Sequence, residues 1–262
     1  MKSDTIIFIA AKDSYIDTWD PFFKLFFKHW PDCPYPIYMM TEAKTFTHEK
    51  VKPLIIPLQP GKSWSEQWAN RVRTALSRTE AKFLIFFHTD YFLSGKVDTA
   101  RIEGLKKMLE PGNVGYIRLV PVPPPTEDFV GDSALGTIDK KEDYSVSFQP
   151  SFWRRDTFEA VLEFGPGPVD VELKGSKNAH TINQTFLSAK KGQPALPYVH
   201  GISKDMWLYD ALRLLASEGF RVGNRRKETF KMYIARISGL RRIYYGIKIK
   251  LSARERTRTS MP

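Results

Sequence analysis

The sequence predicts an α/β protein with a mostly parallel central sheet flanked by helices. Short apolar runs of strand length alternate with longer segments of helical periodicity, which is typical of βαβ units. The clearest run, Phe83–Phe87, is apolar at every position, as expected for a strand that helices cover on both faces. Ser63 and Glu66 have the spacing of a capping box, which marks a helix start between two predicted strands.

The first half of the chain follows this alternation in order. Residues 6–11 form the first predicted strand. Residues 13–30 form the first helix, because aromatic residues recur there near helical spacing. The other elements expected before residue 121 are strands at 36–41, 54–58, 83–87 and 114–120 and helices at 64–76 and 97–109.

The second half is less regular. Residues 121–143 are rich in Pro, Gly and Asp and predict a long surface loop, of the kind that forms lids or binding loops. Residues 165–168, Gly-Pro-Gly-Pro, predict a hard turn. The other expected elements are strands at 144–152 and 195–199, and helices at 157–164, from Ala179 toward 191, and from 203 or 205 to 218.

Charge is distributed unevenly. The chain has 262 residues, a net charge of +11 and one cysteine, so it has no intrachain disulfide and an intracellular location is expected. Residues 221–262 hold 13 Lys and Arg against two acidic residues, whereas the remaining residues balance. The C-terminal segment is therefore the part that attracts an anionic partner. No uncharged run is long enough to cross a bilayer.

Polar residues follow the buried strand directly, as His88, Thr89 and Asp90. Open α/β sheets place their chemistry just beyond the carboxyl ends of such strands. A histidine and a carboxylate there can bind a metal or a phosphorylated ligand. The alternative is that Asp90 only caps the next turn.

The order of the motifs resembles a GT-A glycosyltransferase and, more narrowly, small bacterial enzymes that build lipopolysaccharide or capsular polysaccharide. The resemblance covers most of residues 5–215. Its motifs are Asp13-Ser14-Tyr15, Trp19-Asp20-Pro21-Phe22, His88-Thr89-Asp90-Tyr91-Phe92-Leu93, Tyr116-Ile117-Arg118-Leu119, Ser147 to Arg155, and Val171-Glu172-Leu173 to Ser176.

The resemblance implies a GT-A-like, Rossmann-like fold and transfer of a sugar from a nucleotide-sugar donor to a glycan or lipid-linked acceptor. It assigns residues 1–223 to the glycosyltransferase domain, with a nucleotide-sugar half at 1–120 and an acceptor half at 121–223. Residues 224–262 then form a basic helical tail. The expected location is the cytoplasm, peripheral to the inner membrane.

By the same resemblance, a divalent cation, Mn²⁺ or Mg²⁺, is expected on Asp90, with His200 as a second ligand. The family's acidic motif usually carries two carboxylates, whereas this chain has only the last one, which puts metal dependence in doubt. A lone histidine is more often structural than a ligand.

An inverting transfer needs a carboxylate base near the acceptor hydroxyl. Asp170 and Glu172 follow the predicted turn and are flanked by valines, and apolar neighbours raise the pKa of a carboxyl group. The resemblance favours Glu172, then Asp170, then Asp156. The alternative is that all are ordinary surface acids.

The nucleotide is expected beyond the first strand. Ala11, Asp13 and Tyr15 follow that strand, with His88 beyond the fourth. Asp13 can accept from a ribose or base and Tyr15 can pack on the base, although a helix cap and a core tyrosine explain them equally well. Two further residues, Arg154 and Arg155, can clamp phosphates bidentately or merely start a solvated helix.

The tail has the pattern of a basic amphipathic helix. Apolar residues recur every three or four positions from Phe230 to Leu251, with Lys and Arg on the rest of the circumference. Such a helix fits an anionic membrane surface or docks on the body with its basic face solvated. Nucleic acid is not expected as a partner because no binding motif accompanies the charge. Two rival interpretations are a non-catalytic sugar-nucleotide or glycan-binding relative and a nucleic-acid-binding protein.

Overall fold

The computed structural model describes residues 3–238, and the chain divides into two compact units, residues 1–199 and 200–262. The first unit contains two 3-10 turns, Asp13–Tyr15 and Ala179–Thr181. Its helices are α1 (Ile16–His29), α2 (Trp64–Leu76), α3 (Thr99–Leu109), α4 (Arg155–Leu162) and α5 (Pro168–Asn178). Its strands are β1 (Thr5–Ala10), β2 (Ile37–Thr41), β3 (Val51–Ile55), β4 (Phe83–Phe87), β5 (Tyr91–Leu93), β6 (Val114–Arg118), β7 (Glu127–Asp128), β8 (Leu135–Thr137), β9 (Ser151–Arg154) and β10 (Thr185–Ala189).

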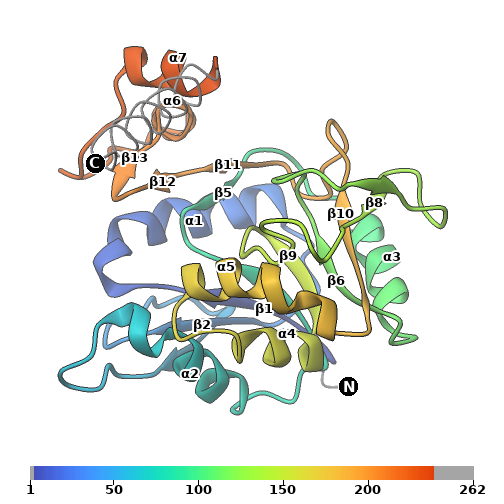
Figure 1. Ribbon diagram of the computed structural model, residues 1–262. Coiled ribbons are helices and arrows are strands. Elements are labelled where there is room, and N and C mark those ends of the chain that lie inside the picture. Colours follow the sequence, from blue (N-terminus) through green and yellow to red (C-terminus); the bar gives the residue numbers. More distant parts are fainter. Residues whose placement is uncertain (1–2, 239–262) are drawn as a thin grey trace, which may run out of the picture. The chain divides into compact units, whose positions relative to one another are not determined.

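A nine-stranded sheet forms the centre of this unit, in the order β3-β2-β1-β4-β9-β6-β10-β8-β7 (Figure 1). The first four strands in this order run parallel, with Ile9 of β1 opposite Phe87 of β4. Strand β9 is antiparallel to both β4 and β6, whereas β6 and β10 are parallel. The prediction of a mostly parallel sheet flanked by helices is confirmed.

Helices cover both faces of the sheet, which explains the continuous apolar run in β4. Phe86 packs against Trp68 of α2 and Phe158 of α4 on one face. Its neighbour Phe87 packs against Phe22 of α1 on the other. All five residues of β4 are buried, and a strand covered on both faces has no need of alternating polar residues.

Local signals predicted several elements well. The capping box is present, with the Ser63 side chain accepting from the Glu66 N–H and the Glu66 carboxylate accepting from the Ser63 N–H. Strand β3 begins three residues earlier than expected and includes Pro53. It pairs only with β2, and an edge strand tolerates proline because it needs hydrogen bonds on one side only.

Several predicted elements of the second half differ from the structure. The helix lies at Pro168–Asn178 rather than from Ala179 on, because proline at its first turn favours a helix start. The residues beyond it form strand β10, which pairs with β6. The strand expected at 144–152 is displaced to Ser151–Arg154. The loop at 121–143 contains two short strands, β7 and β8.

Strand β11 (Tyr198–His200) spans the division between the units. The second unit contains β12 (Ile202–Ser203), β13 (Met206–Trp207), α6 (Tyr209–Ser217) and α7 (Phe230–Ile237). The expected tail helix is described only as α7, and its remainder, from residue 239, lies outside the described residues. No helix within residues 3–238 is both long enough and apolar enough to span a membrane.

Candidate functional site

Four parallel strands, β1 to β4, end at one edge of the sheet, called here the carboxyl edge. Beyond β1, buried Ala11 donates its N–H to the Met40 carbonyl oxygen at 2.9 Å. The Asp13 carboxylate accepts the N–H groups of Glu42, Ala43 and Lys44 at 2.9–3.0 Å. Asp13 therefore shapes the loop after β2, a role different from the helix cap that was the alternative to the expected nucleotide contact.

A row of side chains runs along the carboxyl edge from β1 to β4. The Lys12 ammonium lies 5.9 Å from the ring centre of Tyr15 and 5.6 Å from that of Trp64. Trp64 is 6.4 Å from Trp68 between ring centres, and Trp68 is 6.5 Å from His88. This contact chain brings the predicted residues Tyr15 and His88 to one edge of the sheet.

Several buried polar atoms at this edge have no hydrogen-bond partner among the described residues. Arg71 of α2 is 3% exposed and donates to the carbonyl oxygens of Ile56 and Thr41 at 2.8 and 2.9 Å. Its Nη1 atom and the Glu42 Oε1 atom make no such bond, and neither do the Trp64 and Trp68 Nε1 atoms. Buried polar groups are normally paired, because leaving one unpaired costs about 1–3 kcal/mol. Such an atom also occurs elsewhere, on Trp19 of α1, so it is their place beyond the ends of parallel strands that makes these atoms candidates for contact with a polar ligand or water.

The ionisation of this cluster is also shifted. Burial raises the pKa of Glu42, and the neighbouring Asp13 carboxylate adds to the rise, whereas Arg71 opposes it. Burial lowers the pKa of Arg71, against the attraction of Glu42 and Asp13. The opposite charges of Glu42 and Arg71 therefore attract each other, while burial disfavours the charged form of both.

The polar residues after β4 lie at the same edge. The His88 Nδ1 atom donates to the Ala10 carbonyl oxygen at 2.9 Å. Because a carbonyl only accepts, this bond requires a proton on Nδ1. Thr89 is buried and accepts from the Thr18 hydroxyl at 2.7 Å. The next residue, Asp90, is half-buried.

Asp90 acts on two neighbouring tyrosines. Burial raises the pKa of Tyr91 well above its usual value, and the charges of Asp90 and Glu172 add to the rise. Burial, with Asp90, raises the pKa of Tyr198 to about 12. The Tyr198 hydroxyl donates to the Gln149 side chain at 2.6 Å, and its ring lies 5.6 Å from that of Tyr91. Both tyrosines are therefore neutral hydrogen-bonding groups beside the carboxylate.

Glu172 approaches the same place from α5. Its carboxylate accepts the Phe148 N–H at 2.7 Å. Burial raises the pKa of Glu172, partly offset by the hydrogen bonds from Phe148 and Ser147 and by the positive charge of Arg118. Asp170, two residues earlier, lies about half a turn away on the helix and near Gly165 and Gly167. Of the two candidate bases, only Glu172 is brought to the carboxyl edge by a described contact.

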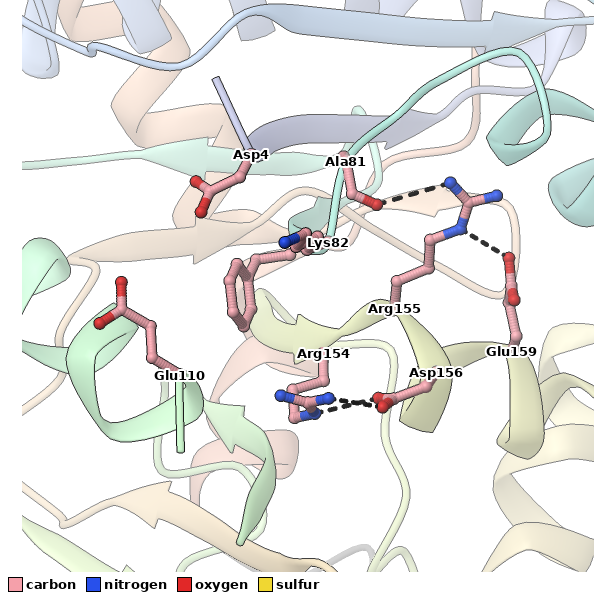
Figure 2. Close-up of a pocket in the computed structure, with 9 residues that line it drawn as sticks. Asp4, Ala81, Lys82, Glu110, Arg154, Arg155, Asp156 and Glu159 are labelled. Atoms are coloured by element: carbon pink, nitrogen blue, oxygen red, sulfur yellow. Dashed lines mark hydrogen bonds and ion pairs between the residues drawn. The ribbon is translucent and has the colours of Figure 1, made fainter. Parts of the chain in front are cut away.

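Arg154 and Arg155 lie at the opposite edge, which corrects the expectation that they clamp the same phosphates as Asp90. Strand β9 is antiparallel to β4, so Arg154 pairs with Phe83 at the beginning of β4, whereas Asp90 follows its end. The two arginines line a pocket of about 610 Å³ with Asp4, Lys82 and Glu110. Figure 2 shows each arginine beside an acid, Arg154 with Asp156 and Arg155 with Glu159, at 2.6 and 2.8 Å. Asp156, the third candidate base, is therefore also at the wrong edge.

The expectation of a divalent cation on Asp90, with His200 as a second ligand, stays a prediction. Within residues 3–238, no group of three or more His, Cys, Asp or Glu side chains is placed to hold a metal ion. His200 belongs to the second compact unit, and Asp90 is the one carboxylate of the His88-Thr89-Asp90 motif. Asp90 would supply one oxygen ligand to a Mn²⁺ or Mg²⁺ ion, and the diphosphate of a bound donor and water would supply the others.

Residues that the sequence interpretation missed complete the arrangement. Arg118 is fully buried and donates to the carbonyl oxygens of Pro123 and Tyr144 at 2.6 Å, holding both ends of the 121–143 loop. Glu42, Arg71 and Tyr198 carry no motif. The one available signal was position, since Glu42 directly follows a predicted strand, as His88 does.

Comparisons with known proteins found distant structural likenesses. A scan of protein-family models and a search of curated proteins each gave no match. A cytidylyltransferase from Leptospira borgpetersenii serovar Hardjo-bovis (strain JB197) is similar with a TM-score of 0.46 and 9% identity, over 82% of this chain and 95% of that chain. S. aureus TarS 1-349 in complex with UDP is similar with a TM-score of 0.48 and 11% identity, over 85% of this chain and 66% of that chain.

A third similar structure is S. aureus TarS 1-349 in complex with UDP-GlcNAc, with a TM-score of 0.41 and 9% identity over 80% of this chain and 64% of that chain. The chain thus spans less than two thirds of TarS 1-349. These TM-scores lie below 0.5, so the function proposed below rests on the chain's own residues.

Proposed function

We propose that this protein is a nucleotide-sugar-dependent glycosyltransferase that uses the carboxyl edge of its sheet. The proposal rests on the side chains that lie along this edge. At one end, buried atoms of Glu42 and Arg71 have no hydrogen-bond partner in the described structure. At the other end, the Glu172 carboxylate is buried and its pKa is raised. Open α/β sheets bind ligands at this edge.

The nucleotide is assigned to the β1–β3 end. The Glu42 Oε1 and Arg71 Nη1 atoms supply an acceptor and a donor without partners in the described structure, which suits the polar edge of a base. Tyr15 and Trp64 offer aromatic faces, and the Lys12 ammonium between them carries the charge that a diphosphate needs. Asp13 acts indirectly by holding the loop that carries Glu42.

The chemical step is assigned to the β4 end. An acceptor hydroxyl attacks the anomeric carbon of the donor and gives its proton to Glu172, while the bond to the diphosphate breaks and the diphosphate leaves with the bonding electrons. A raised pKa makes a carboxylate a stronger base near neutral pH. This arrangement corresponds to an inverting transfer. A divalent cation held by Asp90 would add positive charge that stabilises the leaving diphosphate.

The acceptor class follows from the tail charge. Thirteen Lys and Arg against two acidic residues in 221–262 match a glycan acceptor held on an anionic lipid surface. The tail thus supports a lipid-linked acceptor, and the resemblance of the motifs to small bacterial enzymes adds surface-glycan synthesis at the cytoplasmic membrane face to the proposal. The alternative is a sugar-nucleotide-binding relative without turnover, favoured by the single carboxylate of the His88-Thr89-Asp90 motif.

A panel of UDP-, GDP- and CMP-linked sugars tests the proposal. We expect one donor to bind in the presence of EDTA. That donor should be hydrolysed slowly, and its sugar should be transferred faster when a glycan acceptor is added. The same assay with Mn²⁺ shows whether a metal adds to the rate, and a Mn²⁺ effect that Asp90→Asn abolishes would support Asp90 as a ligand. Binding without consumption of any donor would favour the non-catalytic alternative, and no binding at all would contradict both.

A further inference from the structure

Helix α7 has one face that is fixed to the second unit. The Tyr233 ring lies 4.9 Å from that of Tyr209 on α6. The Arg236 guanidinium donates to both Glu228 and Asp210 at 3.0 Å, and Glu228 is only 2% exposed. These contacts hold α7 against α6 and set its orientation within this unit.

The remaining face of α7 exposes large apolar side chains. Phe230 is 60% exposed, Ile234 39% and Ile237 55%. Their spacing of four and three residues places them on one side of the helix. Single exposed apolar residues are normal on a protein surface. Three at this spacing on an eight-residue helix together make a candidate docking face.

Basic side chains adjoin this patch in sequence. Arg226, Lys227 and Lys231 are exposed, whereas Arg236 is engaged by two acids. All of the chain's excess positive charge lies in residues 221–262. The partner of this region must therefore be both negatively charged and able to accept apolar side chains.

We propose that the exposed face of α7, made by Phe230, Ile234 and Ile237, docks on an anionic lipid bilayer. Apolar side chains enter the boundary between headgroups and acyl chains, while Lys and Arg beside them attract anionic headgroups. A nucleic acid would attract the positive charge but would not bury the exposed isoleucines. The proposal does not depend on the proposed glycosyl transfer.

The assignment separates two kinds of residue that the sequence pattern grouped together. Arg236 belongs to the basic stripe of the expected helix, but in the structure it is an internal anchor and not a headgroup ligand. The lipid-facing set is limited to side chains that are exposed on α7 and immediately before it.

The test is co-sedimentation of the full chain with vesicles of phosphatidylcholine, with and without phosphatidylglycerol. We expect binding only to the anionic vesicles, weakening as salt is added. The double variant Ile234→Gln/Ile237→Gln should bind about tenfold more weakly, because two apolar side chains no longer enter the interface. Replacing Arg226, Lys227 and Lys231 by Gln should weaken binding about fivefold for each charge removed.

A matched control uses two exposed apolar residues at helical spacing on α5, Val169 and Leu173, which are 63% and 50% exposed. The double variant Val169→Gln/Leu173→Gln should bind vesicles as the unaltered chain does. Circular dichroism and thermal unfolding check that all variants fold. Equal binding of the α7 variant and the unaltered chain would overturn the proposal. Binding to DNA or RNA without binding to vesicles would also overturn it. The same holds for self-association that the α7 variant abolishes, if the unaltered chain does not bind vesicles.

Discussion

The two edges of the central sheet differ in how their charged groups are satisfied. At the amino edge, where β1 and β4 begin, Arg154 is paired bidentately with Asp156 at 2.6 and 3.1 Å, and Arg155 is paired with Glu159 at 2.8 Å. At the carboxyl edge, Arg71 and Glu42 keep buried atoms without a hydrogen-bond partner in the described structure. Glu172 at the same edge is desolvated.

This contrast shows that volume alone does not identify a functional site. The amino edge contains the pocket of about 610 Å³ (Figure 2), but its arginines already have their acids. The carboxyl edge is identified instead by groups whose burial is costly without a ligand or a chemical role. If the functional site lies at the carboxyl edge, substitutions there should change binding and rate more than substitutions at the amino edge do.

The largest effect is expected for Glu172→Gln. Glutamine keeps an oxygen that accepts the Phe148 N–H but cannot take a proton from an acceptor hydroxyl. Sugar transfer should fall by about 10²-fold or more, while donor binding, measured by calorimetry, changes little. The matched control Glu163→Gln alters an exposed acid and should leave the rate unchanged. Equal loss of rate in both variants would remove Glu172 from the mechanism.

The second effect concerns the nucleotide end of the carboxyl edge. Glu42→Gln removes the charge beside Arg71, and we expect the affinity for the nucleoside diphosphate to fall about ten- to a hundredfold, as for loss of one hydrogen bond to a charged group. Titration calorimetry with UDP, GDP and CDP measures this change. The distant exposed acid Glu163 again serves as control. An unchanged affinity for every nucleotide that binds would place the base elsewhere.

The third effect concerns stability against pH, to which Glu172 at the carboxyl edge and Asp156 at the amino edge should contribute in opposite directions. The pKa of Glu172 is raised above its usual 4.5, so the folded state binds this proton more tightly than the unfolded state does. Its contribution to stability is greatest below pH 4.5 and is lost as pH rises through the folded pKa. Urea unfolding measured at increasing pH from 4.5 upward should show this loss in the unaltered chain and not in Glu172→Gln.

Asp156 should behave in the opposite way. Burial alone would raise its pKa, but hydrogen bonds from Arg154 and from the Thr157 N–H outweigh burial and lower it below 3.8. Its contribution is therefore present above pH 3.8 and is lost as pH falls through the folded pKa. Asp156→Asn should flatten the acid side of the unfolding profile. If Asp156→Asn instead flattened the unfolding profile near neutral pH, the pH effects assigned to Asp156 and Glu172 would be exchanged.

The smallest effect is expected at the amino edge under neutral conditions. Arg154→Gln removes an ion pair whose acid side chain is 55% exposed, and such pairs contribute about 1 kcal/mol or less. The free energy of unfolding should change by that amount, and nucleotide affinity should stay the same. Loss of nucleotide binding in this variant would show that the pocket in Figure 2 is used after all.

Local patterns were enough to predict most elements of the first half. The β4 run matches the structure at both ends, and the capping box starts α2 at the predicted residue. Periodicity failed after residue 165, where the turn was recognised but the helix was placed too late. There the segment with strand propensity, Thr185–Ala189, gains its structure by pairing with β6, a contact that no local window contains.

The candidate site was predicted in part. Glu172 and His88 were named from the sequence, and the structure brings both to the carboxyl edge through contacts with Phe148 and Ala10. Their use by the reaction stays a prediction. Arg71, Glu42 and Tyr198 were missed because an ordinary residue in an ordinary helix, loop or strand becomes notable only once its partners and its burial are known.

The sequence by itself determined the α/β class, the position of the buried β4 strand and the concentration of positive charge after residue 220. Each of these depends on composition or on spacing within one segment. The tertiary structure decided which polar residues meet. Because β9 runs antiparallel to β4, it carries Arg154 and Arg155 away from Asp90, and strand direction is fixed by long-range pairing rather than by the residues of the strand.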